Sequence, residues 1–255
     1  MVIDDIPKAA GMAYAIIVTV LIVVLLRRGK FSKRMGYGFL AVSTLFGFLV
    51  FAPMLPFQFQ TVLLGKTKAL GVPTAFAWVV LGAFVVLSFA FGRVFCGYVC
   101  PAGAVQELLF RLPTRKVRIG SKTVLIALRL AVLVTFLVLA LVFSIGILKY
   151  LGIRDFFYLS FGSAFLYAFL AFLIVSMFAY RPFCRFACPY GALLSLATAK
   201  GRFKLRRIED CSDCEICEEV CPTNEAGRAD LKQECYMCGK CREACPLDAI
   251  SYARI

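Results

Sequence analysis

The 255-residue chain is 61% apolar, against about 45–50% in soluble globular domains, so we expect much of it to lie in a membrane. Its net charge of +14 is uneven: residues 208–255 hold 11 acids and 5 bases, whereas residues 1–207 hold 4 acids and 24 bases. The bases lie in short segments between apolar runs, which indicates membrane orientation rather than nucleic-acid binding. The absence of histidine excludes bis-histidine haem and Rieske centres, and leaves the 12 cysteines for metal chemistry.

Five apolar segments are predicted to form transmembrane helices, because a span needs about 20 predominantly apolar residues. The first is preceded by acids and followed by bases, so we expect a retained helix rather than a cleaved signal peptide. The predicted spans cover approximately residues 9–26, 36–55, 73–92, 123–148 and 156–180.

The distribution of Lys and Arg between the connecting segments predicts how the helices are oriented. If the first helix runs inward, the cytoplasmic segments 27–34, 93–122 and 181–207 carry 18 bases and the exterior segments carry 5. We therefore expect a multi-pass protein of the cytoplasmic (inner) membrane. Its N-terminus would lie outside and its C-terminal tail in the cytoplasm.

Few polar side chains fall within or near the predicted spans. No Asp, Glu or His lies inside them, so this chain alone is not expected to pump ions. Arg129 lies about two turns into the fourth span, where it would either extend to the interface or face an anionic centre. In the exterior link 56–72, Gln58 and Gln60 could hydrogen-bond a quinone, although a solvated interfacial loop is the commoner arrangement.

Two related cysteine motifs follow the third and fifth spans. R-V-F-C-G-Y-V-C-P-A-G-A-V at 93–105 matches R-P-F-C-R-F-A-C-P-Y-G-A-L at 181–193 with a constant offset of 88 residues. We interpret the pair as an internal repeat of helical hairpins about a pseudo-two-fold axis along the membrane normal. That axis would bring together Cys96, Cys100, Cys184 and Cys188 at the cytoplasmic edge of the membrane.

Four converging thiolates could hold a further iron–sulfur centre with a net negative charge. Basic residues that could offset this charge are Arg93, Arg129, Arg181 and Arg185. The alternatives are a Cu(I) site, thiol–disulfide or quinone-proximal redox chemistry, and simple packing of small side chains.

The tail carries C-x2-C-x2-C-x3-C-P twice, the spacing of bacterial ferredoxins with two [4Fe–4S] clusters. In that arrangement the fourth cysteine of each run binds the other cluster. Structural zinc fits less well, because it has no use for a third closely spaced cysteine. The expected ligand sets are Cys211, Cys214, Cys217 and Cys245 for one cluster, and Cys235, Cys238, Cys241 and Cys221 for the other.

From about residue 36 onward, these motifs together resemble the membrane-bound polyferredoxins of the NapH type and the C-terminal half of the NosR type. The resemblance implies electron transfer between the quinone pool or a cytoplasmic donor and a redox partner, with the 12 cysteines matching the family's cysteines. A copper-reducing oxidase-assembly protein shares C-G-Y-x-C-P. NosR-type proteins carry an exterior flavin-binding domain ahead of the membrane part. Here only about ten residues precede the first span, so we expect another subunit to provide any flavin.

We therefore predict a membrane all-α bundle, residues 1–207, followed by a small α+β two-cluster ferredoxin domain, residues 208–255. The predicted function is that of an electron-transfer subunit of a larger membrane oxidoreductase. Its expected partners are lipids, other redox subunits and a candidate quinone, without haem or nucleic acid. A copper-binding or thiol-redox membrane protein is the alternative.

Overall fold

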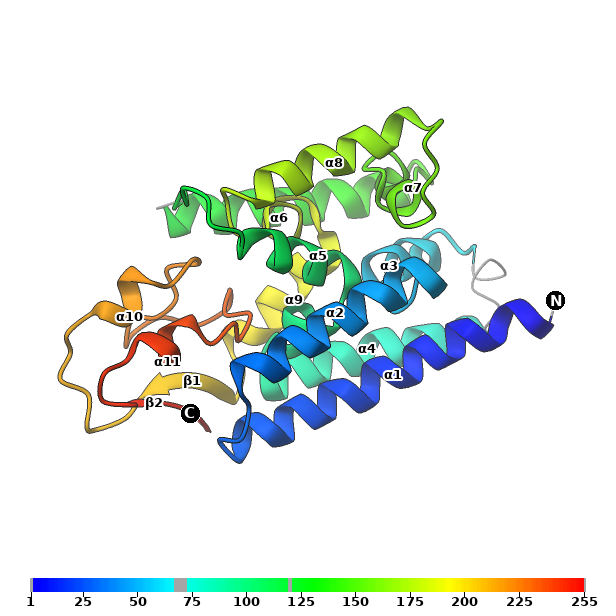
Figure 1. Ribbon diagram of the computed structural model, residues 1–255. Helices are drawn as coiled ribbons and strands as arrows, with labels where there is room; N and C mark the ends of the chain where they lie inside the picture. The colour runs from blue at the N-terminus through cyan, green and yellow to red at the C-terminus, as the bar shows by residue number, and fades with distance from the viewer. Residues whose placement is uncertain (1, 67–72, 119–120, 255) are drawn as a thin grey trace.

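In the computed structural model, long helices lie alongside one another and the tail forms a small unit at one end (Figure 1). The structure describes residues 2–66, 73–118 and 121–254. The outer part of the exterior link, with Lys68, lies outside the described residues. The helices of the bundle are α1 (Val2–Arg27), α2 (Lys33–Val50), α3 (Leu55–Leu63), α4 (Thr74–Phe91), α6 (Lys122–Leu141) and α8 (Ala164–Ser176).

Three helices in the described part of the chain are long and apolar enough to cross a membrane: Ala10–Arg27 of α1, and all of α4 and α6. Helices α2 and α3 would form a fourth span together, bent by 43°. The bend follows Phe51, which ends α2 with a left-handed backbone (φ 54°).

The prediction of five full spans is not confirmed. The segment 156–180 contains α8, which has 13 residues and is about 20 Å long at 1.5 Å per residue, short of a ~30 Å hydrocarbon core. The residues before α8 form two short helices, η3 (Ile147–Lys149) and α7 (Ile153–Phe157), instead of extending it.

Each C-x3-C-P motif forms a π-helical turn that leads into a short helix. The first consists of η2 (Phe95–Val99) and α5 (Pro101–Phe110), and the second of η4 (Phe183–Ala187) and α9 (Pro189–Ala199). Helix α5 packs against α2, and α9 packs against α4 and α6. The cysteine motifs therefore lie inside the bundle.

The tail contains two short helices, α10 (Ile216–Glu219) and α11 (Lys240–Ala244), and an antiparallel strand pair. Strand β1 (Phe203–Arg207) pairs with β2 (Ile250–Arg254), with Leu205 opposite Tyr252. Because β1 precedes the expected boundary at residue 208, the small sheet takes one strand from each expected domain.

The outward faces of the long helices are apolar. Val79 on α4 and Val134 on α6 are 68% and 58% exposed, and Leu49 on α2 is 79% exposed. Exposed apolar surface of this extent is typical of a face that contacts lipid. Together with the three long apolar helices, it identifies a membrane protein.

Close packing of α2 on the first motif can be tested at Gly47. A Cβ atom there would lie 2.6 Å from Pro101 Cβ and 2.6 Å from the ring of Phe157. We expect Gly47→Ala to destabilise the protein by about 1–3 kcal/mol, because the packed side chains must move. The measurement is the apparent unfolding temperature in detergent. Gly82→Ala is the matched control, since a Cβ there meets nothing within 4 Å. Equal unfolding temperatures for the two variants would contradict this packing.

Candidate metal centres

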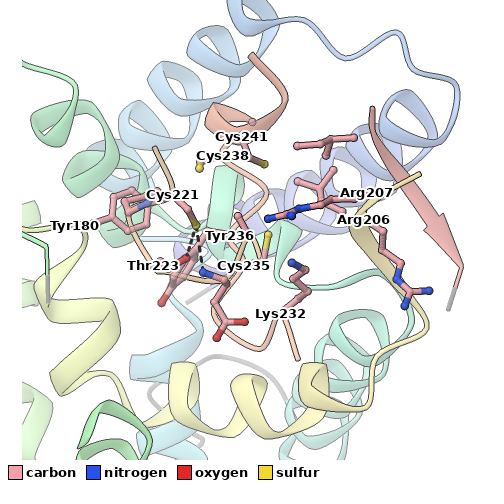
Figure 2. Close-up of a pocket in the computed structure, with 16 residues that line it drawn as sticks. Tyr180, Arg206, Arg207, Cys221, Thr223, Lys232, Cys235, Tyr236, Cys238 and Cys241 are labelled. Atoms are coloured by element: carbon pink, nitrogen blue, oxygen red, sulfur yellow. Dashed lines mark hydrogen bonds between the residues drawn. The ribbon is translucent and has the colours of Figure 1, made fainter. Parts of the chain in front are cut away.

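One expected tail ligand set lines a single cavity. Cys221, Cys235, Cys238 and Cys241 surround it, and Leu205 and Ile250 form part of its apolar wall (Figure 2). The Cys221 sulfur accepts a hydrogen bond from the Glu225 N–H at 3.3 Å. Four sulfurs around a partly apolar cavity fit a [4Fe–4S] cluster.

The cysteines that line this cavity are buried, in the case of Cys221, or half-buried. Burial raises the pKa of Cys238 to about 11 and that of Cys241 to about 12, and the neighbouring thiolates act in the same direction. As free thiols they are therefore protonated at neutral pH, so metal binding must displace their protons.

The cysteines of the second expected tail set differ in their exposure. Cys217 on α10 is buried, Cys214 is exposed, and Cys211 is partly exposed. Helix α10 packs against α11, which precedes Cys245. Among the described residues, no three Cys, Asp or Glu side chains are placed to hold a single metal ion. The cysteine ligands of a [4Fe–4S] cluster need not converge on a single ion, because each cysteine binds a different iron.

The two C-x3-C-P motifs have the same local structure. The Cys100 N–H donates to Phe95 O at 3.0 Å, and the Cys188 N–H donates to Phe183 O at 3.0 Å. In each motif the second cysteine directly precedes the proline that begins the next helix. A proline is favourable there, because the first helical N–H has no intrahelical partner.

The structure brings the four motif cysteines together in the interior. All four are at most 9% exposed. A Cβ atom at Gly103, near Cys100 on α5, would lie 3.7 Å from the sulfur of Cys184 in the other motif. Burial raises the pKa of Cys188, and so would thiolates at Cys184, Cys96 and Cys100. The four motif cysteines are thus buried near one another, and a metal centre held by them stays a prediction.

Three of the predicted arginines meet on one carboxylate that the sequence did not single out. Arg93 binds Glu234 at 2.8 Å and Arg185 lies 3.4 Å from it, while Arg129 contacts the same carboxylate. All four side chains are at most 5% exposed. Arg129 therefore faces the interior and does not extend to the interface.

The fourth arginine is held by a second buried carboxylate. Arg181 binds Glu107 at 3.0 Å, and it also donates to the carbonyl oxygens of Cys96 and Gly97. Glu107 also binds the partly buried Arg111 at 3.1 Å. Sequence reasoning missed Glu107 and Glu234, because each acid is far along the chain from the predicted arginine that it binds.

Buried guanidinium groups in this region keep unused donors. Within the part of the chain that the structure describes, Arg93 Nε and Arg185 Nη2 have no hydrogen-bond partner, although both atoms are buried. Because an unpaired buried N–H is costly, these groups fit the presence of a further anion nearby. Besides Glu234, the ionisable groups that act on Arg93 include Tyr236 and the motif cysteines Cys96, Cys184 and Cys188.

Tyr236 links the tail cavity to the membrane-edge cysteines. It follows Cys235 and lines the tail cavity. Its ring lies under the guanidinium groups of Arg93 at 4.4 Å and Arg181 at 4.9 Å. A Cβ atom at Gly97 would lie 2.3 Å from the Tyr236 carbonyl oxygen, so glycine permits this contact. The tail is therefore inserted directly against the first motif.

The Glu234 ion pairs can be tested by removing one charge. We expect Glu234→Gln to destabilise tail docking by about 3–5 kcal/mol, because three buried arginines lose their shared carboxylate. Limited proteolysis of the tail in the full chain measures this loss.

The control is Glu243→Gln, since Glu243 pairs with Lys33 on the surface and both side chains are at least 42% exposed. An exposed pair contributes about 0–1 kcal/mol. Similar proteolysis rates for the two variants would contradict the assigned role of Glu234.

Comparison with known proteins supports an iron–sulfur assignment. A family profile described as a 4Fe-4S binding domain matches residues 73–120 and 161–208, and each segment contains one C-x3-C-P motif. The uncharacterized protein MJ0750 of Methanocaldococcus jannaschii is 35% identical over 185 residues, which cover 68% of this chain and 77% of that protein.

Two further relatives have descriptive names. The putative electron transport protein YccM of Escherichia coli is 32% identical, over 58% of this chain and 46% of its own. The regulatory protein NosR of Stutzerimonas stutzeri is 31% identical, over 56% of this chain and 21% of its own. The chain thus spans less than half of these two relatives. No solved structure matches it.

Proposed function

The chain belongs to the family of membrane-bound polyferredoxins, and we propose that it conducts electrons between a two-cluster tail and a third centre in its membrane domain. It is an iron–sulfur electron-transfer protein of a membrane. The proposed tail clusters use the two ligand sets that the sequence predicts. The proposed third centre is an iron–sulfur centre held by Cys96, Cys100, Cys184 and Cys188.

The third centre rests on one observation, the surplus of buried positive charge beside four buried cysteines. Four buried arginines face two buried carboxylates, Glu107 and Glu234. Thiols or disulfides at the cysteines would leave that surplus unbalanced. Thiolates on a metal centre carry a net negative charge and would offset it. The 4Fe-4S family profile, which covers both motifs, favours iron over copper.

The side chains between the proposed centres support a fixed route. Tyr180 and Tyr236 line the tail cavity, with ring centroids 5.8 Å apart. Tyr236 packs against Arg93 and Arg181, which border the membrane-edge cysteines. These residues hold the tail in one position and exclude water from the region between the two sites. Iron–sulfur clusters, when bound, supply the one-electron redox chemistry.

The two ends of the molecule suggest where partners bind. On the tail, Cys214 is exposed, so the outer tail cluster would be the one accessible to a soluble redox partner. Lys and Arg counts support placing this end in the cytoplasm. Helices α3 and α7 lie at the other end of the bundle, away from the tail (Figure 1). They border a cavity lined by residues such as Gln60, Lys149 and Tyr158.

This second cavity is the proposed site for a quinone or for the redox group of a partner subunit. Gln60 is buried, and its side-chain oxygen accepts the Leu148 N–H at 2.8 Å. The adjacent Phe59 ring lies 5.5 Å from the Tyr190 ring, and Tyr190 follows the second motif's Cys188 and Pro189. Aromatic side chains thus connect the membrane-edge site to this cavity. Gln58 contacts Met12 instead and does not line it.

The third centre is tested by replacing one cysteine from each motif in the full chain. We expect Cys96→Ser with Cys184→Ser to remove the iron, sulfide and EPR signal of one centre from anaerobically purified protein. The signals of the tail clusters should remain, because their ligands are unchanged. Iron, sulfide and copper analysis with low-temperature EPR provides the measurement.

The matched control is Cys211→Ser with Cys245→Ser, which should remove a tail signal and leave the membrane-edge signal. Unchanged iron in the motif variant would refute the third centre. Loss of copper instead of iron would assign the site to copper. Loss of a disulfide alone would assign it to thiol chemistry.

A further inference from the structure

The two halves of the four-cysteine site differ at one buried position. Gln106 is the sixth residue of α5, counted from Pro101, and Leu194 is the sixth residue of α9, counted from Pro189. Both side chains are fully buried. The repeat therefore places an amide in one half and a hydrocarbon side chain in the other.

Gln106 makes a direct hydrogen bond to a motif sulfur. Its Nε2 lies 3.3 Å from the sulfur of Cys184 and also donates to the Ala102 carbonyl oxygen at 2.8 Å. Its Oε1 accepts the Phe183 N–H at 3.0 Å. A backbone N–H can only donate and a carbonyl oxygen can only accept, so these two partners fix which end of the amide faces the sulfur.

The other half has no matching donor. The side chain of Leu194 has no polar atom. Among the described residues, no side chain donates a hydrogen bond to the sulfur of Cys96. The second cysteines differ in the same sense: the Gly191 N–H donates to the sulfur of Cys188 at 3.2 Å, whereas within the described residues the Cys100 side chain accepts no capping hydrogen bond from the start of α5. Among the described side chains, Gln106 supplies the donor that distinguishes Cys184 from Cys96.

We propose that Gln106 raises the reduction potential of the membrane-edge centre through its N–H bond to Cys184, and that it makes the two halves of that centre electronically unequal. This inference rests on the proposed function, because it requires a metal centre on the four cysteines. Reduction adds negative charge to the centre. A buried N–H aimed at a ligand sulfur stabilises the reduced form more than the oxidised form. The Cys184 half thus better stabilises the added electron density.

The test is a redox titration of anaerobic full-length protein, following the EPR signal that is absent from the Cys96→Ser, Cys184→Ser variant. We expect Gln106→Leu to lower the potential of that signal by about 59 mV, a tenfold shift in a one-electron equilibrium. The tail clusters should keep their potentials. The change reproduces the residue that α9 carries at the same position.

Moving the donor to the other half gives the matched comparison. We expect Leu194→Gln to raise the potential, and the exchange of both residues to restore it towards the unmodified value. If Gln106 acted only on the fold, its replacement would change stability and iron content, but the potential would not fall in one single variant, rise in the other and return in the exchange. An unchanged potential in Gln106→Leu protein that retains its iron would overturn the inference.

A second measurement uses the protein without any substitution. With glutamine labelled by ¹⁵N in its side chain, electron-spin-echo modulation of the same EPR signal should detect a coupled ¹⁵N nucleus. Absence of that coupling would also overturn the inference. These outcomes differ from failure of the proposed function, in which no such signal exists and motif-cysteine replacement leaves the iron content unchanged.

Discussion

The carboxylate of Glu234 lies among Arg93, Arg129 and Arg185, and the placement of both candidate sites depends on this contact. A buried arginine is costly unless a partner offsets its charge. One carboxylate cannot offset three guanidinium groups. The arrangement therefore anchors the tail and leaves positive charge beside the motif cysteines, where an anionic metal centre would compensate it.

The same contact fixes the geometry between tail and membrane domain. Glu234 precedes Cys235 and Tyr236, so its position also sets where that part of the tail cavity lies. Nearby hydrogen bonds hold the same segment, including Tyr98 to the Met237 carbonyl oxygen at 2.8 Å. At the sheet, the Tyr252 hydroxyl donates to the Phe91 carbonyl oxygen at 2.7 Å. A tail attached in this way presents its sites at a constant separation, unlike a mobile tethered carrier.

The sequence predicted the local features well, because they depend on spacing. The crossed ligand pattern groups Cys221 with the second cysteine run; these four residues line one cavity, and their binding of a cluster stays a prediction. The offset of 88 residues predicted two similar turns, and both motifs form a π-helical turn followed by a proline-initiated helix. Helix length was harder to predict, since apolar composition alone did not show that the chain turns before α8.

Long-range charge pairing could not be read from the sequence. Arg93 and Glu234 are 141 residues apart, and no motif or periodicity connects them. The arginines were expected to face an anionic centre, and their described partners are first of all carboxylates. Whether they also offset the charge of a metal centre is part of the proposal. The two repeats also differ in sequence at Gln106 and Leu194, but the sequence alone does not show that Gln106 contacts the sulfur of Cys184.

The most direct measurement of the central claim is an iron-edge anomalous difference map from crystals of the full chain grown without oxygen. We expect two iron sites in the tail and a third between the two C-x3-C-P motifs, beside the arginines that bind Glu234 and Glu107. A map with iron in the tail alone, and with the four motif cysteines as free thiols or disulfides, would contradict it.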